Sequence, residues 1–211
     1  MPTILLFVLV AAARLVGASE IRLMLNTAPL AGHPAGPFAF EAQLTGTANT
    51  VRFTDFVFDG GGPSGTPVLT GSAEGDLQSG FTLRTNTFYN AFVQSFIPGN
   101  AVSFTLHFTP INAPGFPDHV SVSILDSLGV EIPTEGLAAI GADVILSMDI
   151  TSNAVQPRLF GSDRNRVPQA AGPAITMSPP TVVPEPALFA LFGFGLIAIG
   201  ILGRKHRNSG M

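Results

Sequence analysis

The sequence FAFEAQL, residues 38–44, places an apolar side chain at every second position. Successive side chains of a β-strand point to opposite faces, so this alternation predicts a strand with one buried face. The same alternation recurs in two further rows, which are Val102, Phe104, Leu106 and Phe108, and Val144, Leu146, Met148 and Ile150. A chain built around such segments is expected to be mainly β.

Turn-forming residues separate the predicted strands. Glycine, proline, asparagine and aspartate gather at residues 59–65, 98–100 and 112–118, and clusters of these residues favour turns. Residues 51–58 and 120–125 are apolar on more than one face, which suits strands in the middle of a sheet. Short strands at such intervals predict an antiparallel β-sandwich, jelly-roll-like, over residues 19–160.

Residues 87–97 allow two interpretations. Phe88, Phe92 and Phe96 follow one another at a spacing of four, which suits a helix, yet the same three also lie on one side of a strand. We favour the strand, because a lone amphipathic helix has no obvious partner in a β-sandwich.

The composition excludes some classes of partner and chemistry. Residues 19–183 contain thirteen Asp and Glu, six Arg and no Lys. Nucleic acid is therefore not an expected partner, because affinity for phosphates comes mainly from clustered Lys and Arg. The chain has no cysteine, so its stability must come from a packed core and not from disulfides.

The N-terminal residues predict export. An apolar run at residues 4–13 is followed by Val16-Gly17-Ala18, and small residues at these positions suit cleavage after Ala18. We therefore expect a signal peptide over residues 1–18. A buried first strand is the alternative, since Met1-Pro2-Thr3 lacks the usual Lys or Arg.

Residues 161–182 lose the period of two and contain Pro168, Pro173, Pro179 and Pro180. Such a composition predicts a disordered, Pro-rich flexible linker between the β-domain and the C-terminal region.

The C-terminal region is hydrophobic. Residues 187–203 carry no charge, and ten of these seventeen are Leu, Ile or Phe. As a helix they would be about 25 Å long, enough for a single marginal transmembrane helix. A buried core helix is the alternative, but apolar residues on all sides favour the membrane.

The basic residues Arg204, Lys205 and Arg207 follow the hydrophobic segment, and such charges stay on the cytoplasmic side. The preceding domain would therefore lie outside.

The order of these features resembles a known signal. Val183, Pro184, Glu185 and Pro186, a short hydrophobic segment and a basic cluster at 204–207 are similar to the PEP-CTERM sorting signal of Gram-negative bacteria. The resemblance implies that residues 183–186 are the recognition motif of exosortase, a membrane-embedded cysteine transpeptidase. It also implies that residues 187–203 anchor the protein only transiently in the inner membrane, and that residues 204–207 are membrane-retention charges. The destination would be the cell surface or the extracellular matrix.

Candidate catalytic and metal-binding residues are few. His33, His107 and His119 have no spacing typical of a metal site. Weak calcium candidates are Asp55, Asp59, Glu74 and Asp76, since extracellular β-domains often bind Ca²⁺ through loop carboxylates. Their spacing matches no calcium loop, and solvated surface charges explain them better. We expect no metal, no cofactor and no catalytic residues.

Two functions fit these observations. The first is a non-enzymatic exported surface or matrix protein, processed by exosortase, with exopolysaccharide as a candidate partner. The second is a carbohydrate-binding or hydrolytic β-sandwich delivered by the same signal. The chain has no Trp and one Tyr, Tyr89, so aromatic platforms for sugar rings are poorly supplied. We therefore favour the first.

Overall fold

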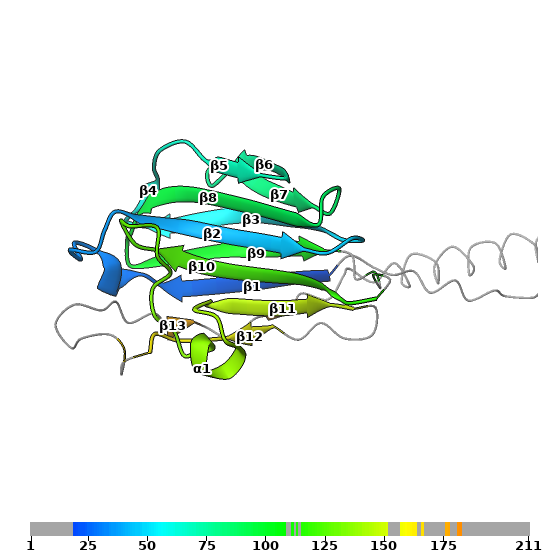
Figure 1. Ribbon diagram of the computed structural model, residues 1–211. Coiled ribbons are helices and arrows are strands. Elements are labelled where there is room, and N and C mark those ends of the chain that lie inside the picture. Colours follow the sequence, from blue (N-terminus) through cyan, green and yellow to red (C-terminus); the bar gives the residue numbers. More distant parts are fainter. Residues whose placement is uncertain are drawn as a thin grey trace, which may run out of the picture.

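The computed structural model describes residues 19–108, 111, 113, 115–151, 157–163, 166, 176–177 and 181–182. These residues form two antiparallel β-sheets that pack face to face, together with two short helices, η1 (Ala28–Leu30) and α1 (Gly136–Ile140) (Figure 1). The mainly β sandwich predicted from the alternating apolar residues is confirmed. Consecutive long strands cross between the sheets, so both sheets contribute to one core.

The first sheet contains both early and late parts of the described chain. Its strands, in spatial order, are β13 (Thr176–Met177), β1 (Ser19–Asn26), β9 (Ala101–Phe108), β3 (Thr50–Asp59), β7 (Gly80–Arg84) and β6 (Ser72–Asp76), and β14 (Thr181–Val182) also pairs with β1. The predicted strand at residues 102–108 is β9, and it lies between β1 and β3.

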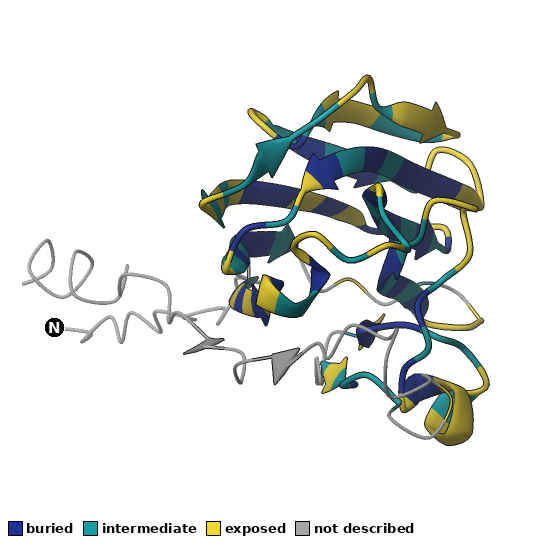
Figure 2. Ribbon diagram, turned by 90° about the vertical axis from the view of Figure 1, so that its left-hand side faces the viewer, coloured by how far each residue is buried: buried dark blue, intermediate teal, exposed yellow. Residues whose placement is uncertain are grey.

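The predicted strand at residues 51–58 is β3 of the first sheet, and the remaining predicted strands lie in the second sheet. Its order is β12 (Arg158–Leu159), β11 (Leu146–Ile150), β10 (Asp118–Leu125), β2 (Phe38–Thr45), β8 (Tyr89–Ile97) and β4 (Gly62–Pro63), and β5 (Val68–Thr70) also pairs with β8. Residues 38–44 belong to β2, in which buried and half-buried residues alternate strictly. Figure 2 shows the same alternation along the strands of the sandwich.

Phenylalanine side chains fill the space between the sheets. The ring of Phe81 from the first sheet stacks on Phe92 from the second, with centroids 3.8 Å apart. On its other side Phe81 stacks on Phe53 at 4.4 Å, and Phe40 meets Phe104 edge to face at 5.3 Å. Burial of aromatic side chains is a large favourable term in folding, and here it joins both sheets.

Strand β3 contains a β-bulge that the sequence did not predict. Val51 and Phe53 are buried, whereas beyond the bulge Phe56 and Phe58 are the residues packed against the core. The register with β9 shifts between Thr54 and Val57, and Asp55 has a φ of 54°. The extra residue moves the inward positions from odd to even numbers. This explains why residues 51–58 look apolar on both faces.

The strand interpretation of residues 87–97 is confirmed. Phe92 and Phe96 on β8 are buried in the core, but Phe88 precedes the strand and is 69% exposed. Only two of the three phenylalanines therefore form the expected buried row.

Of the expected linker, residues 161–182, the structure describes residues 161–163, 166, 176–177 and 181–182, and several of these contact the sandwich. Ser162 forms a β-bridge with Thr134, and Arg166 makes ion pairs with Asp143 and Asp163. Strands β13 and β14 extend the first sheet at the free edge of β1. Main-chain hydrogen bonding to an open sheet edge requires no apolar pattern, so the composition of these residues does not indicate such pairing.

Several predicted features lie outside the described residues. These are the signal peptide at 1–18, the motif at 183–186, the hydrophobic segment at 187–203 and the basic cluster at 204–207. Within the part of the chain that the structure does describe, no helix is long and apolar enough to cross a membrane.

Candidate functional site

The four calcium candidates are placed on two strands of the first sheet, β3 and β6, with β7 between them. Asp55 accepts a hydrogen bond from the Thr54 hydroxyl at 2.9 Å, and Asp59 accepts one from the Asn100 amide at 3.2 Å. The structure therefore gives each β3 carboxylate a partner of its own.

The two β6 carboxylates are also engaged separately. Glu74 pairs with Arg84 at 2.5 Å, and this hydrogen bond lowers the pKa of Glu74. Asp76 accepts hydrogen bonds from the backbone amide and the hydroxyl of Ser79 and from the backbone amide of Gln78, and these bonds lower the pKa of Asp76. Among the residues that the structure describes, no three His, Asp or Glu side chains are grouped so that they could hold a metal ion.

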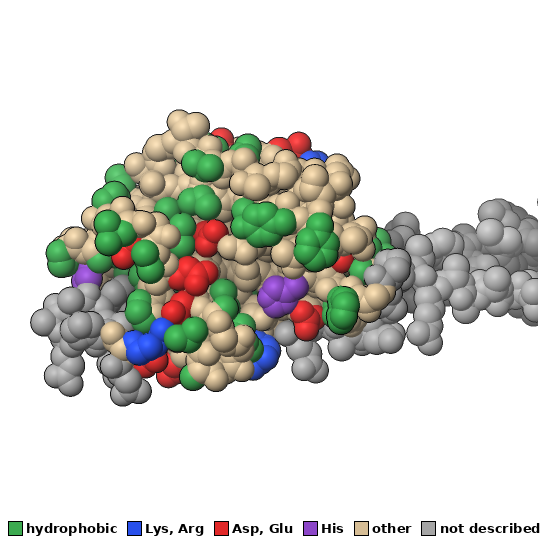
Figure 3. Space-filling view, in the orientation of Figure 1, with side chains coloured by type: hydrophobic (Ala, Val, Ile, Leu, Met, Phe, Trp, Pro, Cys, Tyr) green, Lys and Arg blue, Asp and Glu red, His purple; other side chains and the backbone are tan. Residues whose placement is uncertain are grey.

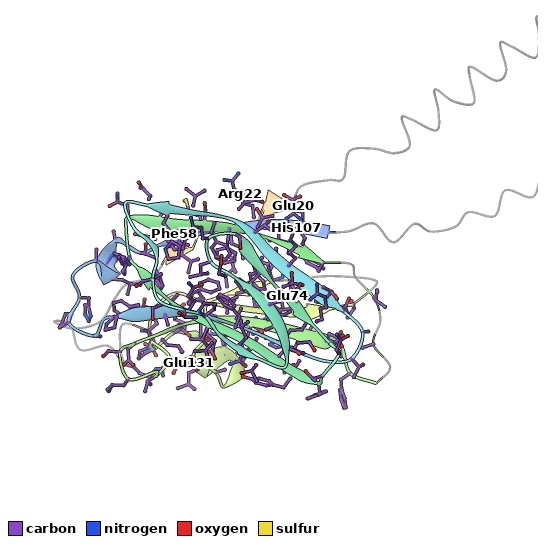
Figure 4. All side chains as sticks on the ribbon, turned by 90° about the horizontal axis from the view of Figure 1, so that it is seen from above. Glu20, Arg22, Phe58, Glu74, His107 and Glu131 are labelled. Atoms are coloured by element: carbon purple, nitrogen blue, oxygen red, sulfur yellow. The ribbon has the colours of Figure 1, made fainter. Side chains whose placement is uncertain are left out.

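His107 lies in a polar cluster on the outer face of the first sheet. Its Nε2 is 2.8 Å from the Thr54 hydroxyl, and its Nδ1 is 3.8 Å from a carboxylate oxygen of Glu20. Figure 4 shows Glu20 and His107 side by side, with Arg22 next to them. The cluster could not be predicted from the sequence because it depends on register, which places Glu20 opposite His107 and His107 opposite Arg52.

A hydroxyl, an imidazole and a carboxylate in this order resemble a nucleophile with its base, so the proton positions matter. The Thr54 hydroxyl has one hydrogen, and the Asp55 carboxylate beside it can only accept. Thr54 therefore donates to Asp55 and accepts a hydrogen bond from His107 Nε2–H. The tautomer of His107 that fits this arrangement has its proton on Nε2, the nitrogen that faces Thr54.

The outer face of the second sheet carries a pair of carboxylates. Glu41 on β2 is opposite Ser123 on β10, and the Ser123 hydroxyl donates a hydrogen bond to Glu131 at 3.0 Å. The pKa of Glu41 is raised, mainly by burial. A hydrogen bond from Gln43 lowers this pKa, and the negative charge of Glu131 raises it. Acidic side chains gather near the centre of this face in Figure 3. Burial also raises the pKa of Tyr89, and the charge of Glu41 adds to this effect.

An open cleft lies at the end of the sandwich where β2 ends and β8 and β10 begin. It has a volume of about 250 Å³ and is lined by Thr45, Gly46, Thr47, Phe88, Phe116 and Pro117. Phe88 and Phe116 are 69% and 89% exposed. We call it the Phe88–Phe116 cleft.

Asp118 fixes the loop beneath this cleft. Its buried carboxylate accepts hydrogen bonds from the backbone amides of Thr47, Ala48 and Asn49 at 2.8, 3.0 and 2.6 Å. Gly46 has a φ of 145°, and a Cβ there would lie 2.0 Å from Asp118 Oδ1. The carboxylate is therefore structural, and only glycine fits beside it.

Comparison with known proteins identifies the C-terminal signal. A family model described as a PEP-CTERM protein-sorting motif matches residues 182–207. The chain thus carries this sorting motif, which confirms the resemblance drawn from residues 183–207. The motif implies export, processing by exosortase and association with the cell surface or membrane. No curated protein and no solved structure matches the chain.

Proposed function

We propose that this chain is a non-enzymatic surface or extracellular-matrix protein whose β-sandwich is the exported part. The signal peptide, residues 1–18, is removed after export. The hydrophobic segment, residues 187–203, then spans the inner membrane as a transient anchor, with Arg204, Lys205 and Arg207 on the cytoplasmic side. Exosortase recognises residues 183–186 and releases the sandwich to the surface or the exopolysaccharide matrix.

The observation that carries this proposal is the sorting motif at residues 182–207. The His107 cluster is consistent with a non-enzymatic role, because Thr54 donates to Asp55 and so accepts, rather than donates, at His107 Nε2. The excess of Asp and Glu over Arg in residues 19–183 also argues against nucleic acid as a partner.

Processing tests the delivery step. When the full chain is expressed beside an active exosortase, we expect loss of the C-terminal tail, measured by intact mass. Glu185→Ala should leave most of the protein uncut, because it removes the only charge of the recognition motif. Glu135→Ala, at an exposed glutamate outside the motif, is the matched control and should be cut normally. Equal processing of both variants would contradict the proposal.

The Glu41–Glu131 pair is the observation that favours the second candidate, a carbohydrate-active sandwich. A carboxyl group with a raised pKa near a second carboxylate is the arrangement that glycosidases use as acid and base. If the protein is non-enzymatic, as proposed, we expect that its incubation with a panel of bacterial polysaccharides produces no new reducing ends. If the wild type releases reducing ends and Glu41→Gln abolishes this release, the second candidate is established instead.

A further inference from the structure

We propose that the end of the sandwich at which the sorting motif begins rests on the membrane surface, with Phe88, Ile111 and Phe116 entering the lipid–water interface. This inference rests on the proposed function, because it requires residues 187–203 to be held in the bilayer. We call the described residues 46–49, 85–88, 111 and 115–117 the motif-proximal end.

The path of β14 locates this end. Thr181 lies opposite Arg22, and Val182 opposite Ile21, in an antiparallel pairing. The chain therefore leaves β14 in the direction of Ser19, the first residue of β1. Ser19 is opposite Phe108 of β9, and Phe108 is opposite Val51 of β3. This is the right-hand end in Figure 1, where the arrowheads of β2, β7 and β11 lie.

Docking of β14 leaves a short connection to the membrane. The sorting motif begins at Val182, the last residue of β14, and the hydrophobic segment begins at Ala187. Five peptide units separate these two residues, and a fully extended chain spans at most about 3.3–3.6 Å per residue, so the reach is about 18 Å or less. A free linker that began at residue 161 would allow a much longer distance between the sandwich and the bilayer. The motif-proximal end is thus held close to the bilayer.

The motif-proximal end has the composition of a membrane-contacting surface. None of its residues is charged, and Phe88, Ile111 and Phe116 are 69%, 45% and 89% exposed. The side chain of Asn49 holds Ile111 in place through two hydrogen bonds to its backbone, at 2.9 and 3.1 Å. Exposed aromatic side chains on fixed loops suit insertion into the interface, where apolar rings leave water.

The opposite end of the sandwich differs in charge. It also exposes apolar side chains, including Leu128 at 84%. Its loop after β10, however, carries Asp126, which precedes Leu128 in the turn. Bringing carboxylates to a bilayer costs desolvation energy. Leu128 therefore provides a matched comparison for Phe116, with similar exposure at the far end.

The chain contains no Trp, so a single introduced Trp reports its own surroundings. The full chain is reconstituted into phosphatidylcholine vesicles that contain lipids brominated along the acyl chain. In Phe116→Trp we expect a blue-shifted emission that the bromolipid quenches, with the indole about 5–10 Å into the headgroup boundary. In Leu128→Trp we expect emission typical of water and little quenching. Both sites are on the surface, so neither change should disturb the core.

A third variant, Phe192→Trp, reports on the hydrophobic segment itself. If Phe192→Trp is quenched but Phe116→Trp is quenched no more than Leu128→Trp, the inference is wrong and the proposed function stands. If Phe192→Trp is not quenched, the hydrophobic segment is not in the bilayer. Both the inference and the proposed function are then wrong. A Phe116→Trp emission that responds to added polysaccharide but not to lipid would assign the end to carbohydrate and overturn the inference.

Discussion

Asp118 shows how one buried side chain can organise a loop. Its two carboxylate oxygens satisfy three successive backbone amides and the side-chain amide of Asn49. Asn49 in turn binds the backbone of Ile111. One carboxylate therefore connects the β2–β3 turn to the loop before β10, and both carry the residues of the Phe88–Phe116 cleft.

Replacement of this carboxylate should be costly. In Asp118→Asn one oxygen becomes an NH₂ group that faces a backbone amide, so a buried donor loses its acceptor. Such a loss costs about 1–3 kcal/mol in the free energy of unfolding, or more for a charged acceptor. Urea denaturation measures the effect. The control is Asp126→Asn, because Asp126 accepts hydrogen bonds through a single oxygen in an exposed turn, which Asn can retain. An equal effect in both variants would contradict this account.

At the scale of elements, the described residues after β12 make specific contacts with the segment around α1. Arg166 donates hydrogen bonds to Asp143, Asp163 and the carbonyl of Thr134. The backbone amide of Glu135 donates to Gly161, and that of Asp163 donates to Pro133. These contacts attach the described residues after β12 to the segment around α1.

Arg166 should make this attachment dependent on pH. Its hydrogen bond lowers the pKa of Asp143, so the stabilisation is present above the ordinary pKa of aspartate and is lost as the pH falls through the folded-state value. In Arg166→Ala we expect faster hydrogen exchange at the amides of Glu135 and Asp163 at neutral pH. The difference from the wild type should disappear in acid.

Arg84→Ala is the control for this experiment, because Arg84 pairs with Glu74 in the first sheet. It should leave exchange at Glu135 and Asp163 unchanged. Unaltered exchange in Arg166→Ala would show that the backbone bonds alone hold the segment.

On the scale of the whole molecule, the sandwich has two different ends. Strand β1 begins at the same end toward which β14 runs, so the first and the last described strands meet there. The described loop residues of that end, 46–49, 85–88, 111 and 115–117, carry no charge, and two exposed phenylalanines lie among them. The outer faces are polar, with His107 on one and the Glu41–Glu131 pair on the other. Strand β14 thus runs toward the end that carries the exposed phenylalanines.

The sequence by itself determined the fold class and the sorting signal. Alternation in residues 38–44 and 102–108 follows from strand geometry, which is local, and the motif at 183–207 is a linear signal that needs no fold. Only two of the three phenylalanines between residues 88 and 96 could be placed correctly, since the strand boundary depends on pairing.

Only the tertiary structure decided the rest, because it depends on which strands become neighbours. The bulge at Asp55, the cluster around His107 and the carboxylate pair of Glu41 and Glu131 each join residues through register. The attachment of β14 to β1 likewise arises from an open sheet edge that no local pattern records. Register is set by the packing of the whole core, and so these sites could not be predicted from the order of residues alone.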